Sequence, residues 1–186
     1  MKIFDFLSDE TIEVDLKAKN KKDVIEELVE RLVKAGKVRN KEPVVKTLME
    51  REELGSTGIG HGVAIPHGKS SLVKELVAAF GRSPQGIEFD ALDGEPVYLF
   101  FLLVAPEGEA GAHLKALAKI SRLLKDKYFR QALIKAETVD EVKRIIQEES
   151  KEYGAVGPWK TGLSSFEIPF PGTEACPSGP GTMNLP

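Results

Sequence analysis

Cysteine is almost absent from this chain of 186 residues, in which Cys176 is the only one. No disulfide can therefore form within the chain, which agrees with a reducing cytoplasm. Long apolar runs are missing too: the longest, residues 97–105, is far too short to cross a bilayer. The first ten residues also lack the apolar stretch of a signal peptide. We therefore expect a cytoplasmic protein with no direct membrane insertion.

An excess of positive charge is also lacking, since the formal net charge is −3 and the pI is about 5.7. Such a protein gains no overall electrostatic attraction to nucleic acid or to an anionic membrane. We expect no nucleic-acid partner, and a basic protein partner would be easier to attract. The composition, 41% hydrophobic and 30% charged, is typical of a globular domain with a sizeable core.

The chain divides by composition into two parts. Residues 1–150 carry apolar periodicity throughout, and we interpret them as one domain. Residues 151–186 hold six of the 17 glycines and six of the 11 prolines, without apolar periodicity. We expect this Gly/Pro-rich tail to be poorly ordered. The start of a truncated second domain is the alternative.

Within residues 1–150, helical and strand patterns alternate. Apolar stripes predict helices over 20–35, 40–54, 113–124, 128–136 and 139–147, and alternating or continuous apolar runs predict strands over 11–16, 63–65, 76–80 and 96–105. Thr138 and Glu141 have the spacing of a capping box, and Gly86 and Gly94 are turn signals. The interleaving predicts an α/β sandwich, with a central sheet flanked by helices on both faces.

Residues 51–70 are rich in glycine and end in Gly68, Lys69 and Ser70, which look like the end of a nucleotide-binding P-loop. That motif needs a glycine five residues before Gly68, where this chain has Val63. A dinucleotide-binding fingerprint that starts at Gly58 would also need a glycine at position 63, and it would follow a strand rather than a helix. Both nucleotide-binding readings therefore fail on spacing.

His67 lies between Pro66 and Gly68, just after a predicted short strand. Proline fixes the backbone on one side and glycine permits close approach on the other, which suits an exposed, aimed imidazole. Imidazole titrates near neutrality and can offer a nucleophilic nitrogen. A structural histidine that caps a turn fits the same local sequence, so the residues alone leave both roles open.

Several linked segments, in the same order, resemble the fructose/mannitol-type (type 2) enzyme IIA domain of the bacterial phosphoenolpyruvate-dependent sugar phosphotransferase system. They are residues 51–52, 55–60, 64–69, 79–83, 89–94, 100–101, 105–108 and 113–124. The resemblance covers about residues 1–150. It implies a single-domain α/β sandwich whose central β-sheet is mixed.

The resemblance also implies three site residues: His67 as the phosphorylated nucleophile, His113 as a second histidine beside it, and Arg51 as an active-site arginine. A guanidinium and a helix start can both stabilise the charge of a phosphoryl group. From local sequence alone, the favoured reading of Arg51 is a surface ion pair with Glu52 or Glu53. The favoured reading of His113 is a helix cap.

The third histidine, His61, occupies a position at which the resemblance does not require histidine, and we expect it at the surface. His61, His67 and His113 could form a metal site by ligand type, but phosphoryl transfer would compete for the same nitrogens. We expect no metal and no cofactor, because both the donor and the acceptor in the implied chemistry are protein side chains.

The implied function is a phosphocarrier. His67 would accept a phosphoryl group from the histidine-containing phosphocarrier HPr and pass it to a cysteine of a IIB domain in a membrane sugar permease complex. We expect this complex to be of the fructose type. The alternative is a nitrogen-regulatory IIA protein whose phosphorylation controls partner binding. A silent interaction domain is a third reading, which the joint presence of Arg51, His67 and His113 disfavours. Cys176 only faintly resembles the phosphocysteine loop of a IIB domain, since no apolar strand precedes it.

Overall fold

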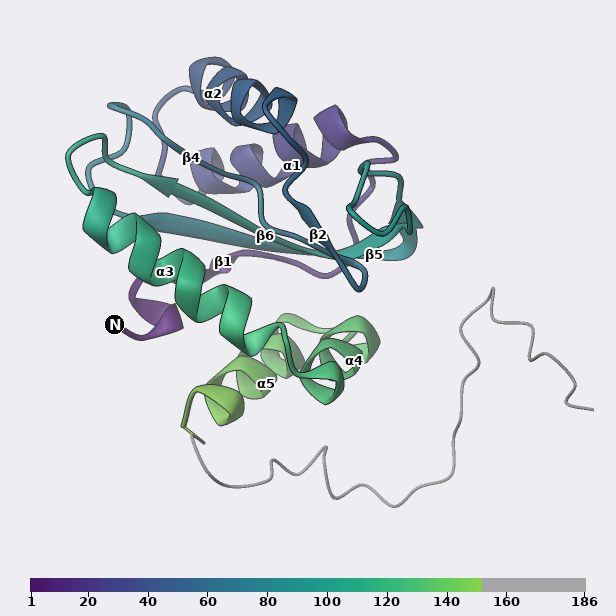
Figure 1. The fold of residues 1–186 in the computed structure, drawn as a ribbon. Coiled ribbons are helices and arrows are strands. Elements are labelled where there is room, and N and C mark those ends of the chain that lie inside the picture. The colour runs from purple at the N-terminus through teal and green to yellow at the C-terminus, as the bar shows by residue number, and fades with distance from the viewer. Residues whose placement is uncertain (152–186) are drawn as a thin grey trace, which may run out of the picture.

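The computed structural model describes residues 1–151, which form a six-stranded sheet covered by helices (Figure 1). The strands are β1 (Leu7–Glu13), β2 (Gly58–Gly60), β3 (Val63–Ala64), β4 (His67–Lys69), β5 (Val77–Ile87) and β6 (Val97–Ala105). The helices are η1 (Ile3–Asp5), α1 (Lys21–Lys34), α2 (Lys41–Glu53), α3 (Ala110–Leu123), α4 (Lys127–Lys135) and α5 (Val139–Lys151). The predicted tail, residues 151–186, lies outside the described residues apart from Lys151.

The sheet is mixed and is built around β6. Its order is β1-β5-β6-β3-β2, and β4 also pairs with β6. β5 runs antiparallel to β6, whereas β3 and β4 both run parallel to it, β3 along Leu99 and Phe100 and β4 along residues 103–105. The segment 63–69 therefore follows one edge of β6 as two short strands, with Pro66 between them.

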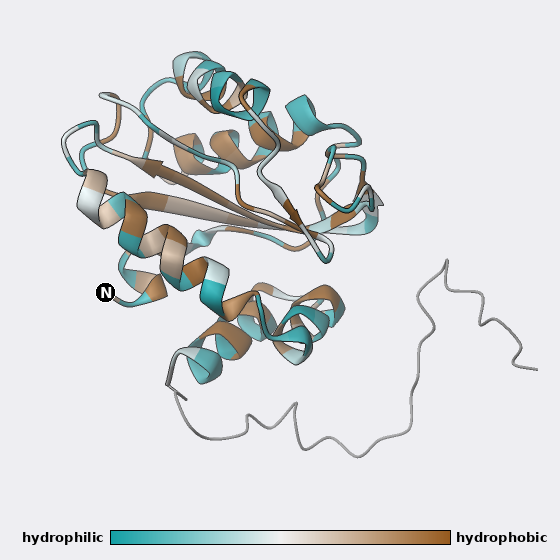
Figure 2. Ribbon diagram, viewed as in Figure 1, coloured by the Kyte–Doolittle hydropathy of each residue, from teal (hydrophilic) through white to brown (hydrophobic). Residues whose placement is uncertain are grey.

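Helices cover both faces of this sheet, α1 and α2 on one and α3, α4 and α5 on the other (Figures 1 and 2). Alternate residues of β6 enter the two cores: Leu99, Phe101 and Leu103 pack toward α3–α5, and Phe100 and Leu102 toward α1 and α2. A strand buried on both faces is apolar at every position, which explains the run 97–105. The predicted α/β sandwich is confirmed.

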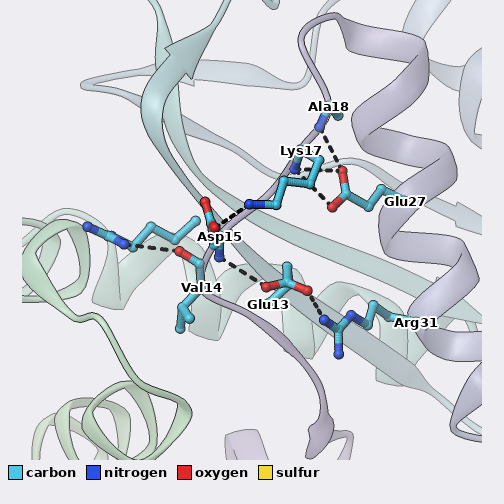
Figure 3. A network of polar contacts seen from close by, with 8 residues as sticks. Glu13, Val14, Asp15, Lys17, Ala18, Glu27 and Arg31 are labelled. Atoms are coloured by element: carbon cyan, nitrogen blue, oxygen red, sulfur yellow. Dashed lines mark hydrogen bonds and ion pairs between the residues drawn. The ribbon is translucent and has the colours of Figure 1, made fainter.

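Polar contacts fix α1 to the end of β1 and to the residues that follow it (Figure 3). The Glu27 carboxylate accepts hydrogen bonds from the backbone N–H groups of Lys17 and Ala18, and Arg31 forms an ion pair with Glu13. Asn20 caps α1 by accepting from the N–H of Asp23. These contacts hold α1 in place beside the sheet.

Several predicted details differ from the structure. The strand predicted over 11–16 is β1, which lies earlier, at Leu7–Glu13. β5 continues past Phe80 to Ile87, so Gly86, with φ +79°, lies in an irregular part of a strand rather than in a turn. The capping box at α5 is only half formed, because Thr138 accepts from the N–H of Glu141 while the Glu141 carboxylate accepts from the N–H of Glu137.

Two short strands, β2 and β4, were not predicted, and α3 begins three residues before its predicted start. None of the helices in residues 1–151 is long and apolar enough to cross a membrane.

Candidate functional site

His67 is the first residue of β4, where it stands opposite Leu103 of β6. The carbonyl of Pro66 accepts a hydrogen bond from the N–H of Leu103. Proline has no N–H to donate, so this missing donor is the only interruption that it causes in the strand pairing. The sequence predicted that strand pairing would stop at Pro66. The structure instead resumes it at once, which holds the backbone of His67 in the sheet.

The imidazole of His67 has a defined tautomer. Its Nδ1 lies 2.7 Å from the backbone carbonyl oxygen of Ile65. A carbonyl oxygen can only accept, so Nδ1 carries the proton and donates it. In the neutral ring, the lone pair is then on Nε2, and this nitrogen is the one available for nucleophilic attack. The sequence could not identify the partner that sets this tautomer.

Gly68 permits α2 to pack closely over β4. A Cβ at this position would lie 3.3 Å from Cγ2 of Thr47 and 3.4 Å from a methyl carbon of Leu48, both on α2. Contacts this short force neighbouring atoms to move. The close approach brings the C-terminal end of α2, which carries Arg51, toward the strand that begins with His67.

His113 lies beside His67, with 5.5 Å between the two ring centroids and an angle of 58° between the ring planes. It is 6% exposed, and its Nε2 is buried without a hydrogen-bond partner among residues 1–151. Buried polar atoms in native proteins are nearly always paired, so an unpaired one needs an explanation. A bound group that reached this nitrogen would supply the missing partner.

The expected position of His113 at the start of its helix needs correction. α3 begins at Ala110, and the backbone N–H of His113 donates to the carbonyl of Glu109. His113 therefore closes the first turn of α3 and does not cap it.

Arg51 lies in the last turn of α2, and its Nη1 donates to the carbonyl oxygen of Gly55 at 2.9 Å. The ion pairs of residues 1–151 include none between Arg51 and Glu52 or Glu53, the reading that local sequence alone favoured. Arg51 is close enough to His67 to contribute to lowering the pKa of its imidazole. The guanidinium thus places positive charge beside His67.

The surroundings of both histidines favour their neutral forms. Burial is the main cause that lowers the pKa of His67, and Arg51 adds to it, while the hydrogen bond to Ile65 and the charge of Glu52 act in the opposite direction. Burial, followed by His67 and Lys69, lowers the pKa of His113. A neutral His67 with a free Nε2 is the form that can act as a nucleophile.

Sequence reasoning missed Glu52 and Thr57. Glu52 is 5% exposed, and its carboxylate accepts from both the N–H and the hydroxyl of Thr57. A signal was present, because Glu52 falls on the buried stripe of α2 with Val45 and Leu48. A carboxylate on an apolar stripe is rarely buried without a specific partner.

His61 is exposed, has φ +57°, and donates its backbone N–H to the Asp93 carboxylate. The part of the chain that the structure describes contains no group of three or more His, Cys, Asp or Glu residues placed to hold a metal ion. His67 lies beside His113 and close enough to Arg51 for the guanidinium charge to act on its ring, whereas His61 is exposed.

Comparison with known proteins identifies the family to which this chain is similar. Residues 5–149 match the family described as "Phosphoenolpyruvate-dependent sugar phosphotransferase system, EIIA 2". The chain is 40% identical over 151 residues to the fructose-specific EIIABC component of Bacillus subtilis, with 81% of this chain and 24% of that protein covered. It is 44% identical over 128 residues to a nitrogen regulatory protein of Bradyrhizobium diazoefficiens, with 68% of this chain and 82% of that protein covered.

Solved structures show the same fold. The nitrogen regulatory protein IIA-Ntr from Neisseria meningitidis superposes with a TM-score of 0.72 at 38% identity, covering 77% of this chain and 98% of that one. The enzyme IIA chain for mannitol from Escherichia coli, solved in complex with phosphorylated enzyme IIB, superposes with a TM-score of 0.63 at 27% identity and covers 74% and 94% of the two chains. This chain spans only about a quarter of the first relative, the EIIABC protein.

Proposed function

The chain belongs to the EIIA 2 family of the phosphoenolpyruvate-dependent sugar phosphotransferase system, and on that premise we propose that it carries a phosphoryl group on Nε2 of His67. Members of this family are phosphotransferase components. The observation that carries the proposal is the Nδ1–H hydrogen bond of His67 to Ile65, which leaves Nε2 with the free lone pair. Burial, by lowering the pKa of His67, favours the neutral ring that attack requires.

In the first step, the Nε2 lone pair of His67 attacks the phosphorus of a phosphohistidine on the phosphocarrier HPr. The N–P bond of HPr breaks, and its electron pair returns to the HPr imidazole. In the second step, a cysteine thiolate of a IIB domain attacks the same phosphorus, and the Nε2–P bond of His67 breaks. His67 returns to its starting tautomer, because Nδ1 keeps its proton throughout and donates it in the hydrogen bond to the Ile65 carbonyl.

His113 and Arg51 stabilise the phosphoryl charge in this proposal. The unpaired Nε2 of His113 donates to a phosphoryl oxygen when this nitrogen carries a proton. The negative charge that phosphorylation adds to His67 favours protonation of His113. Arg51 uses guanidinium donors beyond the one that binds Gly55. The transferred group spreads its charge over three oxygens, which several positioned donors can share.

We assign the chain to sugar uptake of the fructose type rather than to regulation. The match to the fructose-specific relative covers 81% of this chain, whereas the match to the Bradyrhizobium nitrogen regulatory protein covers 68% at slightly higher identity. Residues 80–83 and 105–108 also look more like the fructose-type branch. Regulation remains the second candidate, supported by the 44% identity. A IIB domain as acceptor is supported by the mannitol IIA–IIB complex.

The test uses phosphoenolpyruvate, enzyme I and HPr, with intact-protein mass measured under non-acidic conditions. The wild-type chain should gain one phosphoryl group, and folded His67→Ala should gain none. His61→Asn, a change at a surface histidine, should label like the wild type. Transfer onward to the cysteine of a fructose-type IIB domain supports the uptake role. Labelling without onward transfer supports the regulatory one.

A further inference from the structure

Glu52 is a buried carboxylate next to Arg51, and its hydrogen bonds lead into the site. One carboxylate oxygen accepts from the N–H of Thr57 at 2.9 Å, and the other accepts from the hydroxyl of Thr57 at 2.5 Å. Lys21, from the first turn of α1, lies 3.2 Å from the same carboxylate. Burying an ion pair is costly and contributes little net stability, so its retention beside a reactive histidine suggests a role in positioning.

Thr57 connects Glu52 to His67 through the backbone. The carbonyl of Thr57 accepts the N–H of Ile65 at 3.0 Å, and the carbonyl of Ile65 accepts the Nδ1–H of His67 at 2.7 Å. Glu52 therefore lies three hydrogen-bonded steps from the nucleophilic ring: Glu52 to Thr57, Thr57 to Ile65, and Ile65 to His67.

The segment that Glu52 holds also carries the partner of Arg51. Residues 55–57 join α2 to β2, and the Gly55 carbonyl in this segment accepts from Arg51. Its other side is tied down by Ser56, whose hydroxyl donates to the carbonyl of Phe89 at 2.9 Å. Lys21 extends the contact by pairing with Asp90 at 3.0 Å. The carboxylate of Glu52 is thus linked through hydrogen bonds both to the segment that binds Arg51 and to the ring of His67.

We propose that Glu52, backed by Lys21, is a positioning residue that holds the 55–57 segment, and through it the tautomer of His67 and the placement of Arg51. Glu52 touches neither the phosphoryl group nor a partner. It acts through Thr57, which fixes the Ile65 carbonyl, and this carbonyl keeps the proton on Nδ1 and the lone pair on Nε2. The inference rests on the proposed phosphorylation of His67.

The test compares Glu52→Ala with the matched variant Glu52→Gln. The glutamine amide retains both contacts to Thr57, since its oxygen accepts the N–H and its NH₂ donates to the hydroxyl oxygen. Long-range ¹H–¹⁵N correlation of the His67 ring in the folded, unphosphorylated protein reports the tautomer. Glu52→Ala should shift His67 away from a pure Nδ1–H tautomer, and Glu52→Gln should keep it.

Phosphoryl acceptance from HPr in single turnover is the second readout. A small misplacement of a reacting group costs about 10- to 100-fold in rate, so we expect that loss for Glu52→Ala and recovery of most of the rate by Glu52→Gln. A wild-type tautomer and rate in folded Glu52→Ala would overturn the inference. So would equal losses in the two variants, because the hydrogen bonds to Thr57 would then not be what matters.

If Glu52→Ala does not fold, Thr57→Val and Thr57→Ser decide the question. Valine removes the hydroxyl that binds Glu52 and serine keeps it, so only valine should disturb the tautomer and the rate. Because valine keeps the backbone N–H that binds Glu52, a wild-type result for Thr57→Val would refute the part of the positioning role that runs through the hydroxyl. The tautomer is measured without any phosphoryl donor, so a wild-type chain that shows the expected tautomer but takes no phosphoryl group would refute the proposed function instead.

Discussion

Replacing His113 with leucine should stabilise the unphosphorylated protein and slow phosphoryl transfer at the same time. The Nε2 of His113 is buried without a hydrogen-bond partner among residues 1–151. The centroid of its ring lies 5.5 Å from the centroid of the His67 ring. An unsatisfied buried polar group costs about 1–3 kcal/mol. Leucine has a similar volume and no polar atom, so it removes this cost from the resting state while also removing the donor that the phosphoryl group would need.

Typical magnitudes for an unpaired buried nitrogen and for a lost donor set the expected size of both effects. After allowance for imperfect packing of leucine, we expect about 1 kcal/mol more free energy of unfolding, which for a chain of this size raises Tm by about 2–4 °C. Loss of one donor to the transferred group costs about 2.7 kcal/mol, or about a hundredfold in rate.

The stability gain should also depend on pH, in a direction set by the lowered pKa of His113. Between the lowered folded pKa and the unfolded value of about 6.5, the unfolded chain binds more protons, so the wild type loses stability as pH falls. His113→Leu lacks this titration, and its advantage should grow below about pH 6.5.

The assay pairs thermal unfolding at several pH values with single-turnover transfer from HPr, with His61→Asn as the control for loss of a surface histidine. If His113→Leu unfolds at a lower temperature than the wild type and still transfers at the wild-type rate, then His113 is an ordinary packing residue. The proposal that Nε2 of His113 donates a hydrogen bond to a phosphoryl oxygen would then be refuted.

Two further predictions concern the same site, and a third concerns the end of the domain. Arg51→Ala should slow acceptance about a hundredfold and Arg51→Lys less, since lysine keeps the charge but loses the planar set of donors; equal, wild-type rates would make Arg51 structural. Acceptance should stay constant through neutral pH and fall only below about pH 6.5, because the lowered pKa of His67 keeps Nε2 unprotonated above it; a loss that begins above pH 7 would contradict this. A chain that ends at Ser150 should keep its Tm and its acceptance rate, because the family match ends at residue 149 and the core residues lie before it; a large loss of either would show that residues 151–186 contribute.

Long periodic segments were predictable from the sequence because their pattern is local. The run 97–105 is apolar on both faces and gave β6 to within one residue, and the stripe of α1 together with its Asn20 cap gave both ends of that helix. β2 and β4 have only three residues each and no apolar pattern, and they exist because β3 and β6 pair with them. Such strands depend on contacts that local sequence does not contain.

The candidate site divides in the same way. Local residues allowed either an aimed imidazole or a turn-capping histidine at His67. Only the family resemblance favoured the first role and joined His67 to Arg51 and His113, which are far away in sequence. The tautomer depends on the backbone path that brings the Ile65 carbonyl under the ring after Pro66. No sequence pattern specifies that path, and the burial of Glu52 could be suspected only from its place on the stripe of α2.

The most direct test is the position of the phosphoryl group on the phosphorylated protein, measured by ¹H–¹⁵N and ³¹P NMR of the histidine rings. The hydrogen bond between Nδ1 of His67 and Ile65 predicts one N–P bond, at Nε2 of His67, with Nδ1 still protonated. A phosphoryl group on Nδ1 of His67, on His113 or on any other residue would contradict the account.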